Sequence, residues 1–170
     1  MTKSIENRGS AAKGFSRRKF LQGVSAAASA MAIPGLIPAS ALGKGGTVAP
    51  SERIILGGIG LGGRGTGDLN VMISEPEVQF VAVCEVRKSR RESIKSMVDG
   101  RYGTEDCATY SDLREFLADR TDVGAVLIAT GDRWHATASI LAMRAGKDVF
   151  CEKPSCLTMA EGRKVVETAR

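Results

Sequence analysis

The sequence predicts an α/β fold built on a doubly wound parallel sheet, with helices covering both faces of that sheet. Three observations lead to this prediction. From residue 53 onwards, short runs of Val, Ile, Leu and Ala alternate with longer stretches of helical character. The apolar runs are nearly continuous, as strands buried on both faces require. A glycine-rich segment separates the first apolar run from the first helical stretch, which is the order of a strand–turn–helix unit.

Five segments have the composition of buried parallel strands. They span Arg53–Ile59, Val78–Cys84, Ala108–Tyr110, Gly124–Ala129 and Asp148–Cys151. Consecutive parallel strands need a crossover connection between them, usually a helix. The stretches that follow these five segments are therefore expected to be helices.

The expected helices are Arg64–Ile73, Lys88–Val98, Asp112–Asp119 and Trp134–Ala145, with a fifth that begins near Met159. Their ends carry residues that helix termini favour. Ser111 is the expected N-cap of the third helix, and Gly146 stops the fourth. Thr158 is the expected N-cap of the fifth helix, with Glu161 three residues later, as a capping box requires.

The charge of the chain is concentrated at its N-terminus. The chain has 24 Lys and Arg and 19 Asp and Glu, a net charge of +5. Residues 1–41 hold six of these bases and one of the acids, so the rest of the chain balances at 18 of each. A neutral folded body lacks the basic footprint that phosphate backbones attract. We therefore expect no nucleic-acid partner.

The N-terminal segment has the features of an export signal. Ser16-Arg17-Arg18-Lys19-Phe20-Leu21-Gln22 matches a twin-arginine motif, and an apolar stretch follows from Val24 to Pro38. That stretch is too short for a membrane-spanning helix, and Ala39-Ser40-Ala41 resembles a cleavage site. We expect residues 1–41 to be a signal peptide, residues 42–52 a linker and the protein to be periplasmic, without stable membrane insertion. The alternative is a disordered basic tail ahead of an apolar helix.

The glycine-rich segment Gly57–Gly65 fits the G-x-G-x-x-G pattern of a dinucleotide-binding turn. Two registers are open, Gly58/Gly60/Gly63 and Gly60/Gly62/Gly65. The second is favoured because it puts the apolar strand directly before its first glycine. In such a turn the glycines allow a sharp bend, close approach of a pyrophosphate and close packing of helix on strand.

Glu85 ends the second expected strand, 20 residues after Gly65, where an acid accepts hydrogen bonds from an adenosine ribose. This carboxylate favours NAD, because it repels the 2′-phosphate of NADP. The basic residues just beyond it are able to hold that phosphate, or else form a solvated helix face; they are Arg87, Lys88, Arg90 and Arg91. The choice between NAD and NADP therefore stays open.

The four cysteines do not form a pattern typical of a metal site. Cys84, Cys107, Cys151 and Cys156 include no C-x-x-C pair, and none lies at zinc-ligand spacing from the single histidine, His135. Cys84 and Cys151 end apolar runs. We expect free, buried thiols and no bound metal.

Two later segments resemble the glucose–fructose oxidoreductase / inositol dehydrogenase (Gfo/Idh/MocA) family. Ala129–His135 is similar to the family's A-T-P-D-x-W-H, with Gly131 in place of the usual Pro and Arg133 in place of a frequent His. Ala145–Pro154 resembles A-G-K-x-V-x-x-E-K-P, whose final E-K-P is the most specific signal in the chain. With the glycine-rich segment, the resemblance covers residues 53–170.

The resemblance implies a Rossmann domain that binds NAD or NADP. In the family a larger α/β domain follows; this chain lacks it, and we interpret the chain as C-terminally truncated. Lys153 and His135 are the candidate catalytic residues, and Lys153 would polarise a sugar hydroxyl or help to move its proton. For Trp134 and His135, packing against the sheet is an equal alternative. The candidate cofactor-binding residues are Gly60, Gly62, Gly63, Arg64, Gly65, Glu85, Thr130, Trp134, Glu152, Lys153 and Pro154.

The function that the resemblance implies is that of a nucleotide-binding domain of an exported oxidoreductase acting on CH–OH groups of sugars or polyols. In the family the second domain supplies most sugar contacts and mediates homo-oligomers. This chain alone is therefore expected to bind cofactor without turning over substrate. Two alternatives remain, an NAD-dependent glycoside hydrolase of similar fold and a non-catalytic dinucleotide-binding module.

Overall fold

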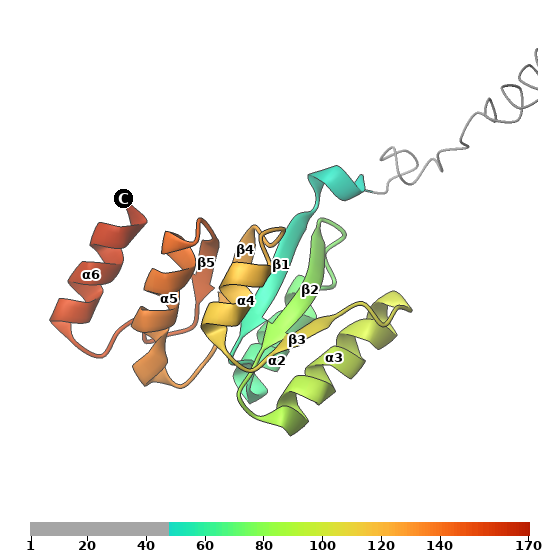
Figure 1. Ribbon diagram of the computed structural model, residues 1–170, viewed down its shortest axis with the longest axis horizontal. Helices are drawn as coiled ribbons and strands as arrows, with labels where there is room; N and C mark the ends of the chain where they lie inside the picture. The colour runs from blue at the N-terminus through green and yellow to red at the C-terminus, as the bar shows by residue number, and fades with distance from the viewer. Residues whose placement is uncertain (1–47) are drawn as a thin grey trace, which may run out of the picture. The chain divides into compact units, whose positions relative to one another are not determined.

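Figure 1 shows the computed structural model, which describes residues 48–170. Strands and helices alternate along this part of the chain. The expected signal peptide, residues 1–41, and residues 42–47 of the expected linker lie outside the described residues. In the rest of the linker, Pro50–Glu52 forms a short 3-10 helix, η2, directly before the first strand.

Five parallel strands form one sheet in the order β3-β2-β1-β4-β5. They are β1 (Ile54–Ile59), β2 (Val78–Cys84), β3 (Ala108–Tyr110), β4 (Ala125–Ile128) and β5 (Asp148–Cys151). The chain winds outward from the central β1 to β3, then crosses back to β4 on the other side of β1. The doubly wound parallel sheet predicted from the sequence is thereby confirmed. In such sheets, ligands bind at the carboxyl ends of the strands, where the winding direction reverses, here between β1 and β4.

The crossover connections contain the helices. They are α2 (Gly63–Met72), α3 (Lys88–Tyr102), α4 (Leu113–Asp119) and α5 (His135–Arg144), with α6 (Met159–Ala169) after β5. A short 3-10 helix, η3 (Asp132–Trp134), leads into α5. The capping box expected at Thr158 and Glu161 is present at the start of α6. Among the described residues, no helix combines the length and apolar composition needed to cross a membrane.

Helices on both faces bury the sheet, as Figure 1 shows, and this produces two apolar cores. On one face, Leu69 of α2 and Ile94 of α3 pack with Leu127 of β4. On the other, Phe116 of α4 packs with Val126, the strand neighbour of Leu127. Because successive strand residues point to opposite faces, both faces need apolar residues, which explains the continuous apolar runs.

The structure corrects two details of the helix ends. Ser111 is not the N-cap of α4; Asp112 is, and its carboxylate accepts a hydrogen bond from the backbone N–H of Arg114 at 2.7 Å. Helix α3 continues a turn beyond the expected end at Val98 and stops at Gly103, where φ is +67°. The added turn carries Tyr102, whose hydroxyl accepts a hydrogen bond from the backbone of Phe80 in β2.

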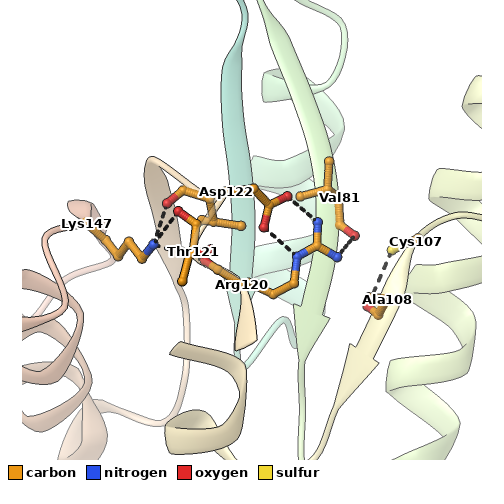
Figure 2. A network of polar contacts seen from close by, with 8 residues as sticks. Val81, Cys107, Ala108, Arg120, Thr121, Asp122 and Lys147 are labelled. Carbon is orange, nitrogen blue, oxygen red and sulfur yellow. Dashed lines mark hydrogen bonds and ion pairs between the residues drawn. The ribbon is translucent and has the colours of Figure 1, made fainter. Parts of the chain in front are cut away.

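The buried side chain of Lys147 links the loop before β4 to the start of β5 (Figure 2). The Lys147 ammonium donates to the backbone oxygens of Arg120, Thr121 and Val123 at 3.0, 3.3 and 2.7 Å. In the same loop, the Arg120 guanidinium pairs with Asp122 at 2.7 Å. An ammonium group has three protons, so these three carbonyls use all of its donors. Lys147 therefore fixes the loop that leads into β4 against the start of β5.

Candidate functional site

The turn after β1 can only be built with glycine at its first position. Gly60 has φ of +69°, and its N–H donates to the carbonyl of Cys84 at the end of β2. A Cβ added to Gly60 would lie 2.7 Å from Cα of Thr130, in the loop after β4. Gly58 lies inside β1. The sharp turn therefore begins at Gly60, in the register Gly60/Gly62/Gly65.

The start of α2 lies close to the sheet for a similar reason. Gly62 is its N-cap and Gly63 its first residue. A Cβ on Gly65, one helical position after Arg64, would lie 2.7 Å from Cβ of Ala129. The first backbone N–H groups of a helix have no intrahelical acceptor and carry partial positive charge. The turn therefore presents donors suited to a phosphate.

Glu85 is held at the end of β2 with almost no solvent exposure. It is 5% exposed. Its Oε1 accepts from the backbone N–H of Arg87 at 2.8 Å, and the guanidinium of Arg91 donates to its backbone carbonyl. Its own N–H donates to the carbonyl of Tyr110, at the end of β3. The carboxylate is thus fixed in place, and a buried acceptor of this kind suits a ribose hydroxyl.

These loops surround a cleft of about 760 Å³. The loops after β1, β2, β3 and β4 line it, together with one side of α5. Seven of the residues predicted from the sequence meet there: Gly60, Gly62, Gly63, Arg64, Glu85, Thr130 and Trp134. Trp134 is 57% exposed, and it is the only tryptophan of the chain. Within residues 48–170, the other five predicted site residues do not line the cleft. They are Gly65, His135, Glu152, Lys153 and Pro154.

One wall of this cleft was not predicted from the sequence. Ser111 and Asp112 line it from the loop between β3 and α4, and Arg114 lines it from the first turn of α4. The Arg114 side chain and backbone N–H hold the pKa of Asp112 down at about 2. One sequence signal was available. β3 was predicted to be a parallel strand, and the loop after its carboxyl end must reach the same edge as Glu85.

The charge of the cleft is positive overall. Four guanidinium groups and two carboxylates line it, from Arg64, Arg87, Arg90, Arg114, Glu85 and Asp112. The volume is typical of a small-molecule site. A glycine turn, a helix N-terminus, surplus positive charge and one buried carboxylate together suit a dinucleotide. Within residues 48–170, no group of three or more His, Cys, Asp or Glu side chains is placed to hold a metal ion.

The E-K-P segment follows β5 beside this cleft. Glu152 accepts two hydrogen bonds from Arg64 of α2, at 3.1 and 3.2 Å, and Arg64 also pairs with Asp68 at 3.0 Å. Burial raises the pKa of Glu152, but the hydrogen bond and charge of Arg64 outweigh that effect and leave the pKa below its ordinary value. Lys153 is exposed, and the Lys153–Pro154 peptide bond is cis. Glu152 is thus an ionised anchor beside Lys153.

His135 is buried beneath the same edge of the sheet. It is 3% exposed. Its Nδ1 lies 2.7 Å from the carbonyl oxygen of Pro154, and its Nε2 lies 3.1 Å from the carbonyl oxygen of Thr130. Both ring nitrogens are therefore directed at the backbone of two loops.

The sequence of this domain matches a known family model. Residues 55–170 match the oxidoreductase family with an NAD-binding Rossmann fold, Gfo/Idh/MocA. The match includes the glycine turn, the cleft and the E-K-P segment.

Individual relatives include hydrolases and dehydrogenases. A glycosyl hydrolase family 109 protein of Bacteroides thetaiotaomicron is 33% identical over 121 residues, which are 69% of this chain and 26% of that protein. The NADP-dependent D-xylose 1-dehydrogenase of Hypocrea jecorina is 39% identical over 93 residues, 54% of this chain and 23% of that protein. The chain thus spans about a quarter of the length of these relatives.

Solved structures show the same fold. The myo-inositol 2-dehydrogenase of Lactobacillus plantarum superposes with a TM-score of 0.60 at 26% sequence identity. The match covers 68% of this chain and 32% of that one.

Proposed function

The chain belongs to the Gfo/Idh/MocA oxidoreductase family, and we propose that it is the cofactor-binding part of an enzyme that oxidises a CH–OH group of a sugar or polyol or reduces the corresponding carbonyl. The cofactor is NAD or NADP, which accepts or donates the hydride when bound. The observation that carries the proposal is the cleft itself. It combines the Gly60 turn, the buried Glu85 carboxylate and a surplus of guanidinium groups at the point where the sheet reverses its winding.

Each part of the cleft has a distinct task in this proposal. The N-terminus of α2 and the side chains of Arg64 and Arg90 hold the pyrophosphate. Glu85 accepts a hydrogen bond from the adenosine ribose. The loops after β4 and β5 would hold the nicotinamide end, because the proposed ribose site at β2 lies in the opposite half of the sheet.

Lys153 supplies the proton chemistry. Oxidation of a CH–OH group requires the hydroxyl to lose its proton while the carbon loses a hydride. The neutral amine of Lys153, just after the carboxyl end of β5, would accept that proton, and the resulting ammonium would return it to the carbonyl oxygen in the reverse reaction. This chain spans only about a quarter of the length of these two relatives. The sugar contacts are therefore proposed to come from polypeptide outside the matched region.

A fluorescence titration tests the cofactor assignment. Trp134 lines the cleft and is the only tryptophan, so its emission reports directly on a bound reduced dinucleotide. We expect saturable quenching by NADH or NADPH. Glu85→Gln should lower the affinity for NADH, relative to that for NADPH, by about tenfold. The variant loses a charged hydrogen bond to the ribose, and it no longer repels the 2′-phosphate of NADPH.

The matched control for this experiment is Glu75→Gln. Glu75 is an exposed carboxylate in the turn before β2, and its replacement should leave both affinities unchanged. If neither dinucleotide changes the Trp134 emission of a folded protein, the proposed function is wrong and a non-catalytic role remains.

An NAD-dependent glycosidase is the second candidate. The relative from Bacteroides thetaiotaomicron that is 33% identical is named as a glycosyl hydrolase family 109 protein. The two candidates share cofactor binding and differ in outcome. A dehydrogenase changes the NADH concentration in proportion to product, whereas such a glycosidase releases the aglycone with no net change in NADH. Both quantities are measured in one assay of the full-length enzyme with nitrophenyl glycosides and free sugars.

We also propose export through the twin-arginine pathway, based on Ser16–Gln22 and the apolar stretch that follows. Fusing residues 1–47 to a folded reporter tests it. The reporter should reach the periplasm, and Arg17→Lys combined with Arg18→Lys should retain it in the cytoplasm. Lys3→Arg combined with Lys13→Arg is the matched control. Export that is indifferent to the arginine pair would refute this assignment.

A further inference from the structure

Lys153 is exposed, yet both of its neighbours in the chain are anchored. On one side, Glu152 accepts two hydrogen bonds from Arg64 of α2. On the other, the carbonyl oxygen of Pro154 lies 2.7 Å from Nδ1 of His135 in α5. The backbone that carries Lys153 is therefore held from two different helices, while its side chain stays accessible.

The His135 ring connects two loops that are distant in sequence. Its Nε2 lies 3.1 Å from the carbonyl of Thr130, after β4, and its Nδ1 contacts the turn after β5. Thr130 also lies against Gly60, the first residue of the nucleotide turn. The ring is 3% exposed, so water does not compete for these contacts. Through His135, the position of the E-K-P turn is set relative to the cofactor loop.

The two contacts of the His135 ring indicate which ring nitrogen carries hydrogen. Both partners of the ring are carbonyl oxygens, which accept and never donate. At least one ring nitrogen of a histidine carries hydrogen, and the shorter contact, 2.7 Å against 3.1 Å, belongs to Nδ1. An Nδ1–H bond to Pro154 is present in the neutral Nδ1–H tautomer and also in the doubly protonated ring.

We infer that His135 is a positioning residue whose Nδ1–H bond to the Pro154 carbonyl fixes the turn that presents Lys153. The inference rests on the proposed function, in which Lys153 faces the nicotinamide end of the cofactor. Neither ring nitrogen is directed into the cleft, because both face backbone carbonyls. His135 therefore acts through Lys153 and does not touch the substrate.

Nitrogen NMR of the imidazole ring tests the proton assignment directly. His135 is the only histidine in the chain, so in a protein without a histidine tag its ring signals cannot come from another residue. The couplings of each nitrogen to the two carbon-bound ring protons distinguish Nδ1 from Nε2. We expect Nδ1 to carry hydrogen in the folded protein. An unprotonated Nδ1 would overturn the inference.

Two isosteric variants separate the two contacts. The amide nitrogen of Asn reaches the position of Nδ1, and that of Gln reaches the position of Nε2. His135→Asn should keep the backbone order parameter of Lys153 near about 0.85, whereas His135→Gln should lower it below about 0.6. The amide of Lys164 in α6 is the internal control and should not change. Equal order of Lys153 in both variants would contradict the inference.

Ligand binding shows whether this positioning reaches the cofactor. His135→Gln should weaken NADH binding about tenfold and leave ADP-ribose unaffected, because ADP-ribose lacks the nicotinamide. His135→Asn should bind both ligands as the wild type does. Equal weakening of NADH and ADP-ribose indicates a merely structural role and refutes the inference. If wild-type protein binds neither ligand, the proposed function fails instead, and the order of Lys153 still decides the positioning.

Discussion

Gly60 and Thr130 lie in direct contact although 70 residues separate them. The backbone of Gly60 adopts a φ of +69°, and the position of its missing Cβ lies 2.7 Å from Cα of Thr130. This contact brings the turn after β1 against the loop after β4, at the point where the sheet reverses its winding. Both residues line the cleft, so its shape depends on this contact.

Gly60→Ala should therefore damage both stability and binding. Alanine is strained at this φ and collides with Thr130, which is expected to lower the free energy of unfolding by about 1–3 kcal/mol and to abolish dinucleotide binding. Gly67→Ala is the matched control. Gly67 is exposed in the interior of α2 with open space at its Cβ, so alanine should stabilise by about 1 kcal/mol. Chemical denaturation and the Trp134 titration measure both effects; unchanged binding in Gly60→Ala would contradict this account.

Lys147→Met tests the link between the loop after α4 and the start of β5. Methionine keeps the length of the side chain and removes the ammonium that serves three carbonyls. Leaving these acceptors without a partner should cost about 3 kcal/mol in the free energy of unfolding. Lys164→Met, at an exposed ion pair on α6, should change it by less than about 0.5 kcal/mol. Similar losses in urea denaturation for the two variants would disprove the structural role of Lys147.

Asp112 should make the domain sensitive to acid. Its folded pKa is about 2, compared with an ordinary value of 3.8, because Arg114 favours the ionised form. A group with a lowered folded pKa contributes its full stability above the unfolded pKa and loses it as the pH falls towards the folded one. The contribution is therefore present above pH 3.8 and is lost between 3.8 and about 2.

Asp112→Asn keeps an N-cap acceptor and removes the titrating proton. The thermal midpoint of this variant should fall less steeply than that of the wild type over this pH range. Asp106→Asn, outside any helix, is the control for a general change in net charge. If the thermal midpoint falls equally steeply with pH in the wild type and in Asp112→Asn, Asp112 is not a source of the acid sensitivity.

The thiols should differ sharply in reactivity. Burial raises the pKa of Cys84 to about 12 and that of Cys107 to about 11, so neither forms an appreciable thiolate near neutral pH. Cys151 and Cys156 are only partly buried, but burial also raises the pKa of the Cys151 thiol. An aromatic disulfide reagent should label Cys156 quickly, and Cys84 and Cys107 only as the protein unfolds. Cys156→Ser should remove the fast phase; fast labelling of Cys84 in native protein would be inconsistent with the buried position.

Local patterns in the sequence were enough to predict the strands, the glycine turn and Glu85 at the end of the second strand. These features have local causes. Continuous apolar runs require burial on both faces, a glycine-rich segment between strand and helix permits a sharp bend, and Thr158 with Glu161 caps α6 within a single turn. Each cause lies within a few residues of its effect. The parallel order then follows, because the helices return the chain to the same edge of the sheet.

Which side chains meet across the sheet could not be predicted from local patterns. Lys147 finds carbonyls 24 to 27 residues away, and His135 bonds to Pro154, 19 residues along the chain. Asp112 becomes both the helix cap and a wall of the cleft, where the sequence favoured Ser111 as the cap. The partner of a polar side chain depends on how helices pack onto the sheet, and that packing is a property of the whole core. Local patterns therefore predicted the elements, and long-range packing set the hydrogen bonds that shape the site.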